Sequence, residues 1–246
     1  MAPDGLKRTR LARTVATRLL GRGPRVVEIV GGVARGGRME LELGVEKAFW
    51  IGVFEPEVQA VLRELVEPGE VAFDVGAYIG FYSLALARLG AGPVVAVEPV
   101  PENAARVRRM AELNGGHIVT VEAVAAAASG RRTLELGPTA AMSRLAGTVG
   151  VTWGPDEPVR RIEVDAVRLD DLARLHGVPR LIKVDVEGAA AEVLGGAAET
   201  LESRPTILCE MHGTDEREDV ERLLRARGYT IEPATADHVV ARHPAQ

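Results

Sequence analysis

From residue 71 onward the chain alternates short apolar runs with longer stretches in which apolar residues recur every three or four positions. The short runs predict buried strands, and the longer stretches predict helices with one apolar face. Strands that are apolar throughout and alternate with helices are typical of an α/β fold, a mostly parallel sheet with helices on both faces. The predicted strands are 71–75, 94–97, 118–121, 181–184 and 207–210, and the predicted helices are 79–89, 102–113, 189–201 and 216–227. In a mostly parallel seven-stranded sheet, residues 230–233 and 238–241 would supply the last two strands.

The first 65 residues do not follow this alternation. Strand-like segments at 26–30 and 39–43, separated by glycine pairs, predict a hairpin. A helix is predicted to open at Glu55, because this residue precedes a proline and lies in an acidic first turn. We therefore expect an N-terminal extension, residues 1–65, that covers one end of a main domain formed by residues 66–246.

A second departure lies between the third and fourth predicted strands of the main domain. Residues 132–136 and 161–168 alternate between apolar and polar positions, which predicts the two strands of a hairpin. They flank an insert rich in glycine, proline and threonine at about 137–158, which we expect to be mobile. The insert holds three candidates for contact with a bound substrate: Ser143, Arg144 and Trp153.

Composition and charge exclude several classes of protein. Apolar residues make up 46% and charged residues 26% of the 246 residues, which is ordinary for a globular protein with a core. The net charge of −5 provides no global basic field that would attract nucleic acid. Cys209 is the only cysteine, which excludes a disulfide framework and a multi-cysteine zinc site, and its apolar strand predicts a small buried residue.

Basic residues are concentrated at the N-terminus. Residues 1–23 hold six lysines and arginines against Asp4 alone, with leucines and a valine at loosely helical spacing, which predicts a basic helix. A solvated helix, a contact between copies in a homo-oligomer, and a weak anchor at a membrane surface all fit this pattern. Because no apolar run resembles a signal peptide or the roughly 18 residues of a membrane span, we expect a cytoplasmic protein without an integral membrane segment.

The first strand of the main domain ends in a glycine-containing turn, Asp74-Val-Gly-Ala-Tyr-Ile-Gly80. A strand that leads through such a turn into a helix is a general cradle for nucleotides, because glycine lets the backbone approach the ligand. A dinucleotide site would need a third glycine, and the leading Asp74 would repel a pyrophosphate but suit a ligand with a cationic amino-acid end. At the tip of the second strand, Glu98 can accept hydrogen bonds from both hydroxyls of a ribose.

Acidic residues at the tips of two consecutive strands together indicate S-adenosylmethionine. The simpler alternatives are that Asp74 caps the following helix and that Glu98 is a solvated strand end. On the cofactor hypothesis, the ligand contacts come from the turn and from the tips of the second and third strands. The residues assigned to them are Asp74, Gly76, Ala77, Tyr78, Gly80, Glu98, Pro99 and, on the adenine side, Glu122.

A second group of polar residues follows the fourth and fifth strands. The fourth strand leads through Lys183 and Asp185 to Glu187, and the fifth ends in Glu210-Met-His212. Because the carboxyl ends of parallel strands meet at one edge of a sheet, these side chains are predicted to share one cleft and to be the catalytic residues. A lysine beside buried carboxylates is an arrangement in which perturbed pKa values are expected.

The chemistry of this group has several explanations. His212 has the pKa range of a general base near neutral pH, and Asp185 can act in the same way. Alternatively, Asp185, Glu210 and His212 hold a divalent cation, and their oxygen-rich set favours Mg²⁺ over Zn²⁺. Structural roles are a third explanation: an ion pair for Lys183, a helix-terminal charge for Glu187 and a solvated strand end for His212. The other histidines are predicted to lie at the surface: His117, His176, His238 and His243.

Four segments occur in an order that points to one enzyme family. They begin at Phe73, Val97, Lys183 and Leu208 and read FDVGAYIGFYS, VEPVPEN, KVDVEG and LCEMH. The chain thereby resembles the FkbM-type S-adenosylmethionine-dependent methyltransferases over roughly residues 55–230. The resemblance implies a class I, Rossmann-like fold with an antiparallel final strand, and O-methylation of a sugar, polyketide or related natural-product hydroxyl. One departure is the tyrosine at position 78, where the family most often has asparagine.

Two other functions fit parts of the pattern. An NAD(P)-dependent oxidoreductase would use the same strand, turn and helix, but the third glycine is missing. A non-catalytic S-adenosylmethionine-binding module would keep the cofactor residues, and the charged cluster at 183–212 argues against it. The sequence therefore predicts an S-adenosylmethionine-dependent O-methyltransferase that acts on a hydroxyl of a small polar acceptor.

Overall fold

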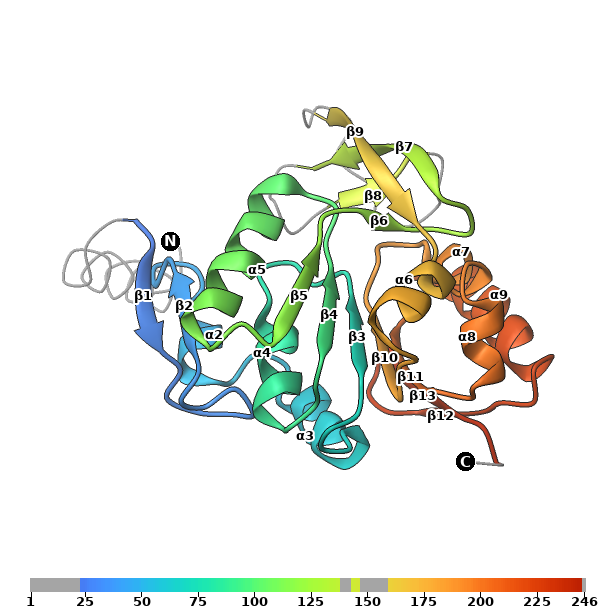
Figure 1. Ribbon diagram of the computed structural model, residues 1–246, viewed down its shortest axis with the longest axis horizontal. Helices are drawn as coiled ribbons and strands as arrows, with labels where there is room; N and C mark the ends of the chain where they lie inside the picture. Colours follow the sequence, from blue (N-terminus) through green and yellow to red (C-terminus); the bar gives the residue numbers. More distant parts are fainter. Residues whose placement is uncertain (1–22, 138–142, 147–158, 245–246) are drawn as a thin grey trace, which may run out of the picture.

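The computed structural model describes residues 23–137, 143–146 and 159–244. Their main feature is a seven-stranded sheet in the order β12-β13-β11-β10-β3-β4-β5 (Figure 1). Its strands are β3 (Ala72–Val75), β4 (Val94–Val97), β5 (Ile118–Val121), β10 (Leu181–Val184), β11 (Thr206–Glu210), β12 (Thr230–Pro233) and β13 (His238–Arg242). Neighbouring strands are parallel except that β13 runs antiparallel to both β11 and β12. The predicted α/β fold and its antiparallel final strand are confirmed.

Helices cover both faces of this sheet because successive strand residues are apolar on opposite sides. Ala72 and Leu208 belong to one core and Phe73 and Cys209 to the other, and all four are almost completely buried. The helices packed on the first core are α3 (Pro56–Leu65), α4 (Phe81–Arg88) and α5 (Pro101–Leu113). Those on the second are α6 (Leu169–His176), α7 (Ala190–Gly195), α8 (Ala198–Glu202) and α9 (Thr214–Arg225).

The helix predicted over residues 189–201 is two short helices, α7 and α8. Gly196 lies at the break, and a Cβ on this residue would stand 2.1 Å from the carbonyl oxygen of Ala126. The backbone at the break therefore packs directly against the chain that follows β5. The prediction of one continuous helix was wrong because apolar periodicity does not register such an approach between backbones.

The N-terminal extension adds to the first core. Its hairpin pairs β1 (Arg25–Glu28) with β2 (Arg38–Leu41) in antiparallel register, which confirms that prediction. A short helix that the sequence did not predict, α2 (Lys47–Ile51), follows it. Leu41 and Leu62 are fully buried in the core shared with α4 and α5. The predicted basic helix lies almost entirely outside the described residues, and the domain boundary at residue 65 stays a prediction.

The predicted insert hairpin is part of a second, smaller sheet. Its order is β6 (Val124–Ala125), β9 (Arg160–Val167), β7 (Gly130–Leu136) and β8 (Ser143–Leu145). The antiparallel pairing of β7 with β9 confirms the predicted hairpin, whereas β6 and β8 were not predicted. This small sheet lies beyond the carboxyl ends of β4 and β5 (Figure 1). Most of the insert, Trp153 included, lies outside the described residues.

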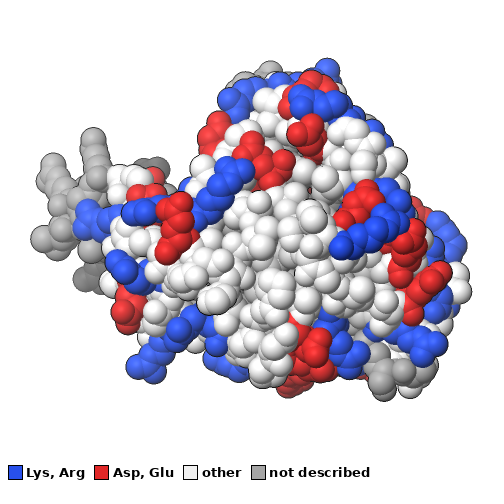
Figure 2. All heavy atoms as spheres, viewed as in Figure 1, with Lys and Arg blue, Asp and Glu red and all other residues white. Residues whose placement is uncertain are grey.

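Charges of both signs are interspersed on the surface shown in Figure 2. Basic and acidic side chains lie beside one another around the rim of this face, and uncharged residues cover its centre. Exposed pairs such as Arg174 with Glu199, at 2.6 Å, contribute little stability because solvent screens them. In the part of the chain that the structure describes, no helix has the length and apolar character needed to cross a membrane.

Candidate active site

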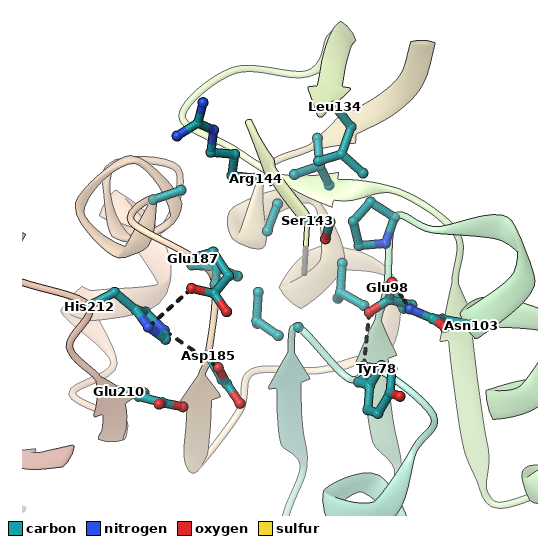
Figure 3. A pocket seen from close by; sticks show the side chains of 18 of the residues that line it. Tyr78, Glu98, Asn103, Leu134, Ser143, Arg144, Asp185, Glu187, Glu210 and His212 are labelled. Carbon is teal, nitrogen blue, oxygen red and sulfur yellow. Dashed lines mark hydrogen bonds and ion pairs between the residues drawn. The ribbon is translucent and has the colours of Figure 1, made fainter. Parts of the chain in front are cut away.

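A cavity of about 640 Å³ lies at the carboxyl ends of β3, β4, β10 and β11 (Figure 3). This is the edge at which open α/β sheets bind ligands, and it is where the sequence placed the two polar groups. The small sheet forms another wall of the cavity through Leu134, Ser143, Arg144 and Leu145. Arg144 is anchored there by Glu135, with 2.9 Å between Nη2 and a carboxylate oxygen.

The glycine turn after β3 forms the middle of the cavity wall. Gly76 has a φ of +82°, and a Cβ there would stand 1.8 Å from the carbonyl oxygen of Asp185. Glycine is therefore required where the turn passes the end of β10. Gly80 precedes α4 with a φ of +88°, a backbone conformation that favours glycine. Gly76 and Tyr78 line the cavity, whereas Gly80 does not.

Glu98 closes one end of the cavity and links two turns (Figure 3). Its carboxylate accepts hydrogen bonds from the backbone N–H groups of Tyr78, at 2.8 Å, and Val100, at 2.9 Å, and from the side-chain amide of Asn103, at 3.3 Å. Burial raises the pKa of Glu98 to about 7 against the effect of these donors. Pro99 follows it on the cavity wall, and Asn103 is a further lining residue that sequence reasoning missed.

Asp74 does not line the cavity, although the sequence placed it against the cationic end of a ligand. It is completely buried, and its carboxylate accepts a hydrogen bond from the Ser83 hydroxyl at 2.6 Å. Its other oxygen lies 3.7 Å from Nζ of Lys183. The side chain points into the fold because Asp74 is the third residue of a fully buried strand, and α4 presents Ser83 to it.

Two further cofactor assignments also fall outside the cavity lining. Ala77 is buried within the turn. Glu122 is absent from the cavity lining and forms an exposed ion pair with Arg108 at 2.5 Å. The short side chains of Ala123, Val124 and Ala125 line that end of the cavity in its place.

Lys183 lies beneath the cavity wall and contacts one carboxylate from each of the two polar groups, Asp74 and Asp185. It is 1% exposed, and its Nζ lies 3.0 Å from Oδ2 of Asp185 and 3.7 Å from Oδ1 of Asp74. The same ammonium lies 4.6 Å from the ring centroid of Tyr82. Burial lowers the pKa of Lys183, but the two carboxylates outweigh burial and hold the amine protonated. The ion pair considered for Lys183 from the sequence is therefore present, and it reaches Asp185 on the cavity wall.

His212 lies between two carboxylates that face the cavity (Figure 3). Its Nδ1 is 3.2 Å from Oε2 of Glu187, and its Nε2 is 3.7 Å from Oδ1 of Asp185. Potential metal-ligating atoms of Asp185, Glu210 and His212 all lie within 4.8 Å of one another. The structure thus brings together all five residues assigned to catalysis, with four on the wall and Lys183 beneath it.

The pKa values in this cluster are shifted in opposite directions: that of Asp185 is lowered, and those of Glu210 and His212 are raised. Burial opposes ionisation of Asp185, but Lys183 and His212 hold its pKa well below the usual range. Burial and the charge of Asp185 raise the pKa of Glu210 to about 8. Burial lowers the pKa of His212, but Asp185, Glu187 and Glu210 outweigh it and raise the pKa to about 9. Near neutral pH the cluster therefore favours an ionised Asp185 and a protonated His212, and it disfavours ionisation of Glu210.

The backbone around His212 is fixed by Glu216. This buried carboxylate accepts hydrogen bonds from the N–H of His212 at 2.7 Å and from the N–H of Ala190 at 2.9 Å. It therefore ties the end of β11 to the start of α7. His238, predicted to lie at the surface, is instead 4% exposed on β13, with Nε2 3.6 Å from Glu210. The prediction was wrong because β13 pairs with β11 and brings the residue beside the site.

The N-terminal extension supplies a cavity wall that sequence reasoning missed. Its lining residues are Val45, Glu46, Phe49, Phe54 and Glu55. Phe49 and Phe54 pack against each other with tilted rings whose centroids are 4.3 Å apart, and both pack on Phe81 of α4. Glu46 is held by a pair of hydrogen bonds from Arg106 of α5, each 2.7 Å long. The acidic start of the helix at Glu55 was visible in the sequence, but its position at the cavity was not.

The strand order, the glycine turn and the cavity at this edge are those of a class I S-adenosylmethionine-dependent methyltransferase. Among solved structures, the TYW2 protein of M. jannaschii in complex with AdoMet shares this fold. It is 13% identical, with a TM-score of 0.51 over 90% of this chain and 85% of that one. The putative transferase PH0793 of Pyrococcus horikoshii is 14% identical, with a TM-score of 0.50 over 90% and 71%.

The family follows from the sequence comparisons. The model of the methyltransferase FkbM domain matches residues 74–231, so the chain belongs to this family and is an S-adenosylmethionine-dependent methyltransferase. It is 29% identical to the hexuronic acid methyltransferase AglP of Haloferax volcanii, over 69% of this chain and 67% of that protein. It is 30% identical to the 31-O-demethyl-FK506 methyltransferase FkbM of Streptomyces tacrolimicus, over 69% and 77%.

Proposed function

We propose that the protein transfers a methyl group from S-adenosylmethionine to a hydroxyl of a small polar acceptor, such as a sugar or polyketide. The observation that carries this proposal is His212, which lies between Asp185 and Glu187 on the wall of a cavity whose other end holds Glu98. The end of the cavity at Glu98 suits a nucleoside, and the end at His212 suits removal of a proton from an acceptor oxygen. The names of the two relatives, a hexuronic acid methyltransferase and a 31-O-demethyl-FK506 methyltransferase, support acceptors of this kind.

The residues present fit S-adenosylmethionine. The buried Glu98 would accept hydrogen bonds from the ribose hydroxyls, and the small apolar side chains at 123–125 would contact the adenine. Gly76 would let the backbone approach the ligand between the two ends. When bound, the cofactor supplies an electrophilic methyl group on a positively charged sulfur.

The polar cluster would prepare the acceptor oxygen. Asp185 is fixed by Lys183, so its carboxylate would orient the acceptor hydroxyl by hydrogen bonding. His212 would take the hydroxyl proton through Nε2, a buried atom 3.7 Å from Asp185 that has no hydrogen-bond partner among the described residues. Glu187 would hold the ring through Nδ1 and stabilise the imidazolium that forms. Mg²⁺ held by Asp185, Glu210 and His212 is the alternative, since these atoms cluster closely enough for one ion.

The proposed role of His212 predicts an alkaline rise in rate. Because its pKa is raised to about 9 in the ligand-free protein, only about 1% of the imidazole is neutral at pH 7, and kcat/KM should rise about tenfold per pH unit up to about pH 9. The measurement is a pH profile of kcat/KM, with and without excess EDTA. A flat profile between pH 7 and pH 9 would assign proton removal to Asp185, and loss of rate in EDTA would favour the metal.

Binding experiments separate this proposal from its rivals. S-adenosylhomocysteine at 100 times its Kd should stabilise the protein by about 2.7 kcal/mol, which corresponds to a rise in Tm of about 5–10 °C, and NAD(P) should give no rise. Stabilisation by NAD(P) alone would support an oxidoreductase instead. A non-catalytic module would bind S-adenosylhomocysteine but methylate no member of a panel of sugars and polyketides offered with radiolabelled S-adenosylmethionine.

A further inference from the structure

Glu55 lines the cavity with a carboxylate. It lies outside the segment matched by the family model, which begins at residue 74. It precedes α3 with a φ of +42°, a left-handed conformation that is uncommon for a residue with a side chain and is often found at functional sites. Oε2 of Glu55 accepts a hydrogen bond from the Tyr82 hydroxyl at 2.5 Å. Among the described residues, no hydrogen-bond donor contacts Oε1 of Glu55, which leaves that oxygen available to a ligand.

The contacts of Tyr82 place Glu55 at one end of the cavity. Tyr82 lies on α4, the helix that follows the glycine turn, and its ring lies over the ammonium of Lys183 on β10. In the sheet, β3 lies between β10 and β4. Glu98 follows β4, so it lies at the end of the cavity opposite to β10. A nucleoside whose ribose binds Glu98 would extend across Gly76 towards Glu55. The part of S-adenosylmethionine that lies beyond its ribose and sulfur is a zwitterionic amino acid.

The α-ammonium of this amino acid is bound favourably by a carboxylate. The sequence suggested Asp74 for this role, but Asp74 does not line the cavity. Asp74 is completely buried and already faces Ser83 and Lys183. Glu55 is half-buried, and the group that it contacts is an uncharged phenol. A carboxylate without a cationic hydrogen-bond partner, at the edge of a cavity, binds an ammonium more favourably than one that is already neutralised.

We propose that Glu55 binds the α-ammonium group of the cofactor and that Tyr82 positions its carboxylate for this contact. The inference rests on the proposed function, because it takes S-adenosylmethionine as the ligand of this cavity. It makes the N-terminal extension part of the cofactor site.

The test compares S-adenosylhomocysteine with the analogue that lacks only its α-amino group. Calorimetry would measure both dissociation constants for the full-length wild type and for Glu55→Gln, which keeps the shape of the side chain and removes its charge. A charge-assisted hydrogen bond predicts that the wild type prefers the amine-bearing ligand about 10- to 100-fold and that Glu55→Gln loses most of this preference. Affinity for the deaminated analogue should stay within about twofold.

Matched variants keep the outcome interpretable. Glu57→Gln removes an exposed carboxylate from the first turn of the same helix and should retain the wild-type preference. Tyr82→Phe should lower the preference without removing it, and it serves as the test if Glu55→Gln does not fold. The role of Glu55 would be contradicted if Glu55→Gln kept the preference for the amine-bearing ligand or lost affinity equally for both ligands. Either result would leave the proposed function intact. Failure of the wild type to bind S-adenosylhomocysteine at all would instead remove the proposed function.

Discussion

Replacing His212 by asparagine should lower kcat by about 100- to 10,000-fold while the affinity for S-adenosylhomocysteine changes little. His212 lies on the wall away from Glu98, so its loss removes the proton acceptor without disturbing the ribose end. Asp185→Asn should have a comparable effect, because the amide orients the acceptor less well and no longer balances Lys183. Turnover is measured with radiolabelled S-adenosylmethionine, and binding is measured by calorimetry.

His117 provides the matched control for the histidine variant. It is exposed and far from the cavity wall, so His117→Asn should keep the wild-type kcat. Unchanged turnover in both His212→Asn and Asp185→Asn would remove the catalytic assignment. A parallel loss of S-adenosylhomocysteine binding would show that these residues act in cofactor binding.

Lys183→Met should destabilise the protein by about 3–5 kcal/mol, because it leaves buried carboxylates without their shared cation. Asp74 is completely buried, and Lys183 is the only cation that forms an ion pair with it among the described residues. The methionine preserves most of the volume of the lysine, so lost packing contributes little. The free energy of unfolding is measured by urea denaturation at pH 7.

Two further variants separate charge from packing. Lys47→Met replaces an exposed lysine of α2 and should leave the free energy of unfolding within about 0.5 kcal/mol of the wild type. Adding Asp74→Asn to Lys183→Met should recover part of the lost stability, because it removes one uncompensated charge. Equal stability of Lys183→Met and the wild type would show that this ion pair is energetically neutral.

Much of the fold was predictable because its signals are local. The central strands β3, β4 and β10 are short, largely apolar runs, and burial on both faces of the sheet requires such runs. The period-two segments around the insert correctly predicted the pairing of β7 with β9. The break between α7 and α8 was missed because Gly196 meets the backbone of Ala126, a contact between segments that are far apart in the sequence.

The candidate site was predictable only where strand ends carry its residues. Lys183, Asp185 and His212 were placed at one edge by the rule for parallel strands, and the structure brings them together. Glu46 and Glu55 were missed because the extension reaches the cavity by packing and not through the sheet. Glu55 gave a helix-start signal that could not be told from an ordinary acidic first turn, and Glu46 gave no signal.

The sequence by itself determined the class of fold, the family and the chemical types of the groups at the strand ends, since these depend on apolar periodicity and on residues near turns. The tertiary structure decided which carboxylates reach the cavity. Asp74 and Glu55 are both acidic, but only the packing of α3 and α4 makes one of them a buried partner of Lys183 and leaves the other exposed to a ligand. Burial and neighbouring charge, which set the state of each carboxylate, are properties of the folded chain.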